Sequence, residues 1–161
     1  FLKEKSEAFV SKKIMGKKTD EIIMPGGHLT VAQLTAMLNT IPMEITFVDE
    51  DNINRFFNEG PKDFKRPGMA IDREVFSCHP PKVEQQVRHI IGEFRKGTLD
   101  KVPIWMEKNG KTMLVTYMAV RDAAGTYLGT MELVQDMGFA KEHFLSDVKA
   151  KEAALRAGME D

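Results

Sequence analysis

The clearest hydrophobic pattern in the chain lies in the segment 82–97, where apolar residues recur every three or four positions. These residues, which fall on one face of an α-helix, are Val83, Val87, Ile90, Ile91 and Phe94. Pro81 suits the first turn of such a helix, and Gly97 suits its C-cap. We therefore predict a helix over residues 83–96 that packs on the core through Val83, Val87, Ile91 and Phe94.

Three further segments are predicted to be helical. Thr30 and Gln33 have the spacing of a capping box and begin a short helix over 29–41. The charged segment 1–24 is interpreted as an N-terminal helix, and "MPGGH", 24–28, as a linker, because Pro and paired Gly interrupt helices. A charged helix follows Gly138. The predicted domains are an N-terminal helical segment and linker (1–28), a central domain (29–138) and a C-terminal helix (139–161).

The remaining patterned segments predict β-strands. Residues 44–58 are typical of a hairpin, with the turn chemistry of Asp49-Glu50-Asp51-Asn52 between two β-forming runs. Three more strands, 103–108, 111–121 and 126–135, are joined by Asn109-Gly110 and by Asp122-Ala123-Ala124-Gly125. The order of elements predicts an α+β domain: one five-stranded antiparallel sheet with helices on one face, and a flanking helix at each end of the chain.

Composition narrows the class of protein. The chain has 161 residues, of which 42% are hydrophobic, and 23 basic against 24 acidic residues give a net charge of −1. This balance provides no general attraction to nucleic acid or to an anionic membrane surface, and no apolar run is long enough to span a bilayer. A single cysteine cannot form an internal disulfide. We expect a piece of a longer cytoplasmic protein.

Residues 41–138 resemble a PAS domain, and specifically the type attached to hemerythrin-like domains in bacterial proteins. The similar stretches are "IPMEITFVDEDNINRFFN", "CHPPK", "FRKG", "WMEKNGK" and "YMAVRDAAGTYLGTMELVQDM". The resemblance implies a sensory or regulatory module. Such a module binds a small molecule between the sheet and the long helix, or only dimerises, and passes a change to its flanking helices.

The stretch "SCHPPK", 77–82, contains the only cysteine beside a histidine. Adjacent residues of an extended segment point in opposite directions, so Cys78 and His79 do not form a nucleophile–base pair, and we expect no enzyme activity. The spacing of Cys and His is not that of a zinc site. Haem needs one axial histidine. His89 points away from the apolar face of its helix, so His79 is the better haem ligand, although a loop-capping role for His79 is favoured over haem binding.

Ten residues are candidates to line a ligand pocket: Phe47, Phe56, Cys78, His79, Val87, Ile91, Trp105, Met113, Val115 and Tyr117. Flexible methionines both fill irregular cores and line adaptable pockets. Because alternate residues of a strand face the same side, one of two sets looks toward the long helix. These sets are Met113, Val115, Tyr117 and Leu114, Thr116, Met118.

Two functions remain open from the sequence. The first is a module that senses a small apolar ligand, or relays a signal, to other domains of a longer protein. The second is a structural dimerisation domain with no ligand. The strands 111–121 and 126–135 carry apolar residues on both faces, so both faces of the sheet are expected to be covered. We predict a homodimer that forms through the outer face of the sheet and the flanking helices.

Overall fold

The computed structural model describes residues 20–60 and 70–159. The chain divides into two compact units, Phe1–Ile41 and Pro42–Asp161. The predicted domain boundaries after residues 28 and 138 do not coincide with this division and stay predictions. In the described part of the chain, no helix is long and apolar enough to cross a membrane.

The first unit contains a β-hairpin where the sequence indicated the end of a helix and a linker. Strand β1, Glu21–Met24, pairs antiparallel with β2, Gly27–Thr30, around a turn at Pro25 and Gly26. The helix interpretation was wrong for Glu21–Met24, because Pro and Gly here join two paired strands and do not end a helix. Residues 1–19, the rest of that predicted helix, lie outside the described residues.

Helix α2, Val31–Thr40, begins with the predicted capping box. The backbone N–H of Gln33 donates to Thr30 Oγ1, and the backbone N–H of Thr30 donates to Gln33 Oε1, both at 3.0 Å. These two bonds satisfy donors that an α-helix leaves free at its first turn. The cap therefore fixes where α2 begins.

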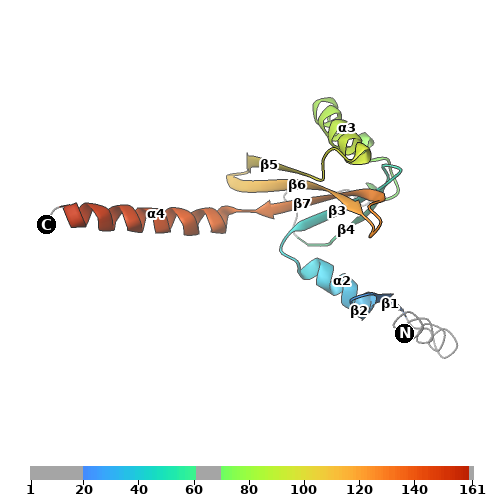
Figure 1. Ribbon diagram of the computed structural model, residues 1–161, viewed down its shortest axis with the longest axis horizontal. Helices are drawn as coiled ribbons and strands as arrows, with labels where there is room; N and C mark the ends of the chain where they lie inside the picture. Colours follow the sequence, from blue (N-terminus) through green and yellow to red (C-terminus); the bar gives the residue numbers. More distant parts are fainter. Residues whose placement is uncertain (1–19, 61–69, 160–161) are drawn as a thin grey trace. The chain divides into compact units, whose positions relative to one another are not determined.

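The second unit is built on the predicted five-stranded antiparallel sheet, which confirms the α+β fold (Figure 1). Its strands are β3 (Glu44–Asp49), β4 (Asn54–Phe57), β5 (Lys101–Lys108), β6 (Lys111–Arg121) and β7 (Tyr127–Asp136). The order across the sheet is β4-β3-β7-β6-β5. Strand β7 therefore lies in the centre, between the β3–β4 hairpin and the β5–β6 hairpin.

Three residues have backbone conformations that the sheet requires, two in a hairpin turn and one within β7. Asn109 and Gly110 both have positive φ, 52° and 74°, as the tight turn between β5 and β6 requires. Gly129 has φ +155°, and a Cβ atom there would lie 2.2 Å from the carbonyl oxygen of Val48 and 2.8 Å from the ring of Phe47. Only glycine lets β7 approach β3 so closely at this point.

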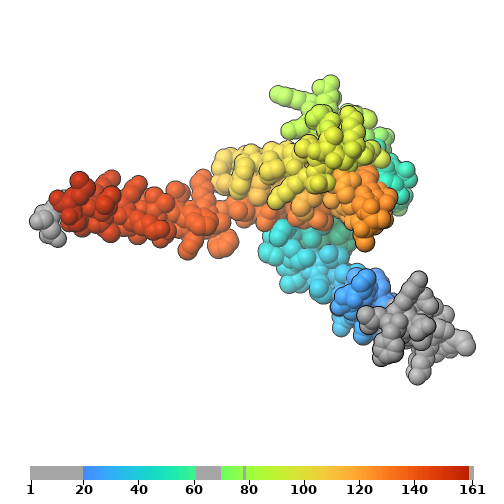
Figure 2. Space-filling model, viewed as in Figure 1, coloured from blue at the N-terminus to red at the C-terminus, as the bar shows by residue number. Residues whose placement is uncertain are grey.

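Helix α3, Pro81–Lys96, lies against one face of the sheet (Figures 1 and 2). Pro81 is its first residue, and Gly97 ends it in the left-handed conformation with φ 76°, as predicted. Val87, Ile90, Ile91 and Phe94 are buried. Val83, however, is 39% exposed, so its predicted packing was wrong. It lies on the first turn, one turn before the residues that reach the core.

Two other elements complete the second unit. A short 3-10 helix, η2, covers Val75–Cys78. The predicted C-terminal helix is α4, Gly138–Met159, and none of its described residues is buried.

Candidate functional site

The strand register defines which side chains share the face that α3 covers. The first row across β3, β7, β6 and β5 is Glu44, Val134, Val115 and Ile104. The second row is Thr46, Glu132, Tyr117 and Val102, and the third begins with Val48, Thr130 and Ala119. Val48 packs with α3 residues. Because side chains alternate along a strand, all three rows belong to this inner face.

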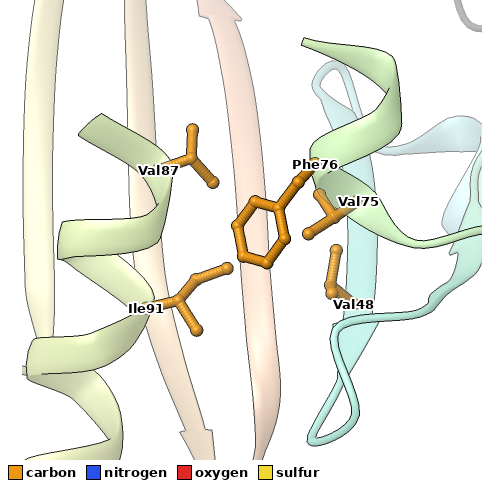
Figure 3. Packing of buried hydrophobic residues seen from close by; sticks show 5 residues of the cluster. All are labelled: Val48, Val75, Phe76, Val87 and Ile91. Atoms are coloured by element: carbon orange, nitrogen blue, oxygen red, sulfur yellow. The ribbon is translucent and has the colours of Figure 1, made fainter. Parts of the chain in front are cut away.

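The first hydrophobic cluster joins α3 to η2 and β3. It consists of Val48, Val75, Phe76, Val87 and Ile91. Figure 3 shows the ring of Phe76 between the two α3 residues on one side and Val75 and Val48 on the other. The guanidinium of Arg88 lies 3.8 Å from the centre of the same ring, which holds Phe76 from the solvent side. Phe76 was not among the residues predicted to line the site, because it lies in an irregular segment without a periodic pattern.

The second hydrophobic cluster lies on the sheet itself. Its buried members are Met113, Val115 and Val134, with the partly buried Ile104 and Met106 packed against them. Tyr117 is half-buried and packs against both clusters. The core between α3 and the sheet is therefore divided into two clusters that Tyr117 connects.

A carboxylate is buried on this same face. Glu44 is 8% exposed, and in residues 20–60 and 70–159 neither of its side-chain oxygens has a hydrogen-bond partner. Burying a charged group without a partner is costly, and such groups are rare in native structures. No pattern in the sequence indicated this buried group, because an acidic residue at the start of a strand normally lies in solvent.

The backbone on both sides of Glu44 is held firmly by Asn58. Asn58 Oδ1 accepts a 2.8 Å hydrogen bond from the backbone N–H of Ile45, and Asn58 Nδ2 donates a 2.8 Å bond to the carbonyl oxygen of Met43. Asn58 itself is 2% exposed. These contacts fix the direction of β3 at its first residue, so the inward position of Glu44 follows from a rigid backbone.

The register separates the predicted pocket residues into two groups. Val87, Ile91, Met113, Val115 and Tyr117 share the inner face or its helix cover. Of the two sets left open by the sequence, the one containing Met113, Val115 and Tyr117 faces α3.

Three other candidates lie on the opposite side of the sheet. Phe47 and Phe56 are paired with each other, out of phase with Val48, and Trp105 is 62% exposed. Pocket roles for Phe47, Phe56 and Trp105 are therefore incorrect for the inner face. The reason is the phase of each strand, which sequence alternation alone does not connect to a particular face.

The "SCHPPK" stretch forms the passage from η2 into α3. The backbone N–H of His79 donates to the Phe76 carbonyl oxygen at 3.3 Å, and His79 Nδ1 lies 2.8 Å from the Val75 carbonyl oxygen. A carbonyl oxygen only accepts, so Nδ1 carries the proton in this contact. These bonds match the loop-capping role. Cys78 is the last residue of η2, and His89 is exposed, as its helical position predicted.

The turn between β3 and β4 is organised by Asp49 and touches the C-terminal end of α3. Burial of the Asp49 carboxyl opposes its ionisation, but hydrogen bonds from Arg55 and from the N–H groups of Ile53 and Asp51 hold its pKa below the ordinary value. Arg95 of α3 donates to Asn52 Oδ1 in this turn at 2.7 Å. The turn therefore holds the C-terminal end of α3 through the hydrogen bond of Arg95.

In residues 20–60 and 70–159, no three His, Cys, Asp or Glu side chains are grouped to hold a metal ion. The inner face thus offers apolar surface, the Tyr117 ring and carboxylates.

Comparisons with known proteins agree with this architecture. A protein-family model described as PAS domain matches residues 34–138. The C-terminal domain of a Streptococcus mutans protein is 39% identical to this chain with a TM-score of 0.73, covering 78% of this chain and 98% of that one.

Two further structures are similar to this chain at lower identity. The PAS domain of Bordetella pertussis BvgS is 11% identical with a TM-score of 0.51, covering 74% of this chain and 95% of that one. The PAS domain of a Colwellia psychrerythraea protein is 15% identical with a TM-score of 0.48, covering 67% and 97%. A comparison with curated proteins found no match.

Proposed function

The chain belongs to the PAS domain family, and from this premise we propose that it is a sensory module that binds a small molecule between α3 and the inner face of the sheet. The observation that supports this most directly is the divided core. Val87 and Ile91 of α3 belong to one cluster, while Met113, Val115 and Val134 of the sheet belong to another. A ligand beside Tyr117 would contact both clusters and couple α3 to the central strands.

Native mass spectrometry of freshly purified protein tests this proposal. The expected result is a non-covalent adduct of constant mass that denaturation removes. Val115→Phe should abolish the adduct, because the larger side chain fills the inner face. Leu114→Phe is the matched control, since it adds volume to the neighbouring residue, which faces the other side. Equal retention in both variants would contradict the proposed location.

A structural dimerisation domain without ligand is the second candidate. The position of Phe76 favours it, because its ring already fills space between α3 and η2 (Figure 3). In that case neither the wild type nor either variant would show an adduct in the native spectrum, and Val115→Phe would act only by overpacking. The same pair of variants therefore separates the two functions.

The relay would run through a homodimer and its flanking helices. Apolar residues of α4 recur at heptad spacing, and all are exposed: Leu145, Val148, Leu155 and Met159. Exposed apolar residues at these intervals are typical of a coiled coil, and the partner we propose is a second copy of this chain. Trp105, also exposed, extends the apolar surface onto the outer face of the sheet.

The domain that responds to the module would belong to the same, longer protein. We propose that a ligand-dependent shift of the sheet changes α4, which leads toward another domain of a longer cytoplasmic protein. The resemblance of "CHPPK" and its neighbouring stretches favours a hemerythrin-like domain as that companion. We assign no catalytic step to the module itself.

A further inference from the structure

Glu44 is an acidic side chain of the inner face whose role the packing described so far does not explain. Its carboxylate lies in the first row beside Val134, and both of its oxygens are covered without a hydrogen-bond partner in the described residues. A group of this kind is expensive to keep in a core. Because Asn58 fixes the backbone on both sides, the strand does not turn Glu44 outward to relieve that cost.

The surroundings indicate what kind of partner would satisfy this carboxylate. Glu132 lies in the neighbouring row, and the first two rows contain no Lys or Arg. The inner face is therefore locally negative. The remaining neighbours in these rows are mostly apolar, with the Tyr117 ring beside Glu132. Carboxylates attract cations that donate hydrogen bonds, and an aromatic ring adds to that attraction.

We propose that Glu44 is the recognition group of the ligand site and that the ligand is a small organic cation with N–H donors on an apolar body. This inference rests on the proposed function, since it names the ligand class for the same site. Two N–H donors on one planar group would satisfy both oxygens of Glu44 at once. The apolar body would lie against Val134 and Val115. The flexible Met113 and Met106 side chains would move to admit it.

Benzamidine is the probe for a direct test, because it joins an amidinium with paired N–H donors to an apolar ring. Benzoate has the same ring and the opposite charge. Isothermal titration of the whole chain should give saturable binding of benzamidine, with benzoate at least tenfold weaker. Glu44→Gln should weaken benzamidine binding at least tenfold. Glu50→Gln, which changes an exposed carboxylate of the turn between β3 and β4, is the matched control and should leave the affinity unchanged.

The thermal midpoint of the ligand-free protein gives a second, independent readout. A carboxylate reserved for a ligand destabilises the empty fold, so Glu44→Gln and Glu44→Leu should both raise the midpoint by several degrees. Glu50→Gln should not change it. A lower midpoint in both Glu44 variants would mean that the carboxylate stabilises the fold itself, and this result would overturn the proposal.

The outcomes distinguish the inference from the function on which it rests. If benzoate binds as tightly as benzamidine, or if Glu44→Gln binds benzamidine normally, the role of Glu44 is refuted while the site between α3 and the sheet stands. No saturable benzamidine binding also refutes the ligand class. The adduct measured by native mass spectrometry then decides separately whether the module binds a ligand at all.

Discussion

Helices α3 and α4 are both amphipathic segments of one chain, yet the structure uses them differently. Four apolar residues of α3 are buried against the sheet or η2, whereas no described residue of α4 is buried. Phe94 in α3 has 0% exposure and Phe144 in α4 has 66%. The difference shows that an apolar pattern predicts a helix with a hydrophobic face, but does not predict which partner covers that face.

Polar contacts strengthen the difference. Arg95 near the end of α3 is held by the Asp49-organised turn, and Arg121 of β6 donates to the carbonyl oxygen of Phe94 at 2.8 Å. The first turn of α4 is tied to the sheet by Lys141, which donates to Thr112 Oγ1 at 3.1 Å. Helix α3 is thus part of the core of the second unit, whereas α4 contacts the sheet near its first turn and leaves its apolar residues exposed.

The largest expected effect comes from truncating the same residue type in each helix. Phe94→Ala should lower the free energy of unfolding by about 3–5 kcal/mol, because it leaves a cavity in a filled core. Phe144→Ala should change it by less than about 0.5 kcal/mol, as exposed substitutions do. Urea denaturation measures both. Similar losses for the two variants would remove the contrast between the helices.

The dimer prediction sharpens the contrast by giving α4 a partner. Leu155→Glu places a charge in the apolar row of both copies and should weaken self-association about a hundredfold, or about 2.8 kcal/mol per dimer. Sedimentation equilibrium measures the dissociation constant. Ala153→Glu, an exposed position of α4 off that row, adds the same charge and is the control. A wild-type chain that remains monomeric at high micromolar concentration would exclude α4 as the dimer contact.

Acidification tests the turn between β3 and β4, which Asp49 organises and which holds Arg95 of α3. Asp49→Asn should cost about 1–2 kcal/mol at neutral pH, since it weakens charge-assisted hydrogen bonds. Because the pKa of Asp49 is lower in the folded than in the unfolded chain, its contribution is complete above the ordinary value of 3.8. It is lost as the pH falls through the folded value. The difference between wild type and variant in urea unfolding should therefore shrink below about pH 3.8 and stay constant above about pH 6.

The smallest effect concerns glycine within α3. Gly92 is inside the helix, and no atom lies within 4 Å of a Cβ placed there. Gly92→Ala should therefore raise the free energy of unfolding by about 0.5–1 kcal/mol. Gly97→Ala should lower it, because residue 97 ends α3 with φ 76°. Thermal denaturation of the two variants checks that alanine stabilises the interior of α3 and destabilises its C-cap.

The sequence by itself determined the local elements and the family of the second unit. The Thr30–Gln33 cap, the Asn109-Gly110 turn and the α3 pattern are short-range signals, in which a few neighbouring residues carry all the necessary chemistry. The hairpin of β1 and β2 was missed because Pro25 and Gly26 suit a turn between strands as well as a break after a helix. Val83 was wrongly predicted to be buried, because periodicity shows which face of a helix is apolar but not how many of its turns pack against the core.

Only the tertiary structure decided the composition of the candidate site. Alternation along a strand shows which residues share a face, but long-range pairing selects the face that α3 covers. The strand order β4-β3-β7-β6-β5 places Glu44 beside Val134 and turns Phe47 and Trp105 to the other side. A buried carboxylate at residue 44 is invisible in the sequence because its burial depends on residues 90 positions away, at β7.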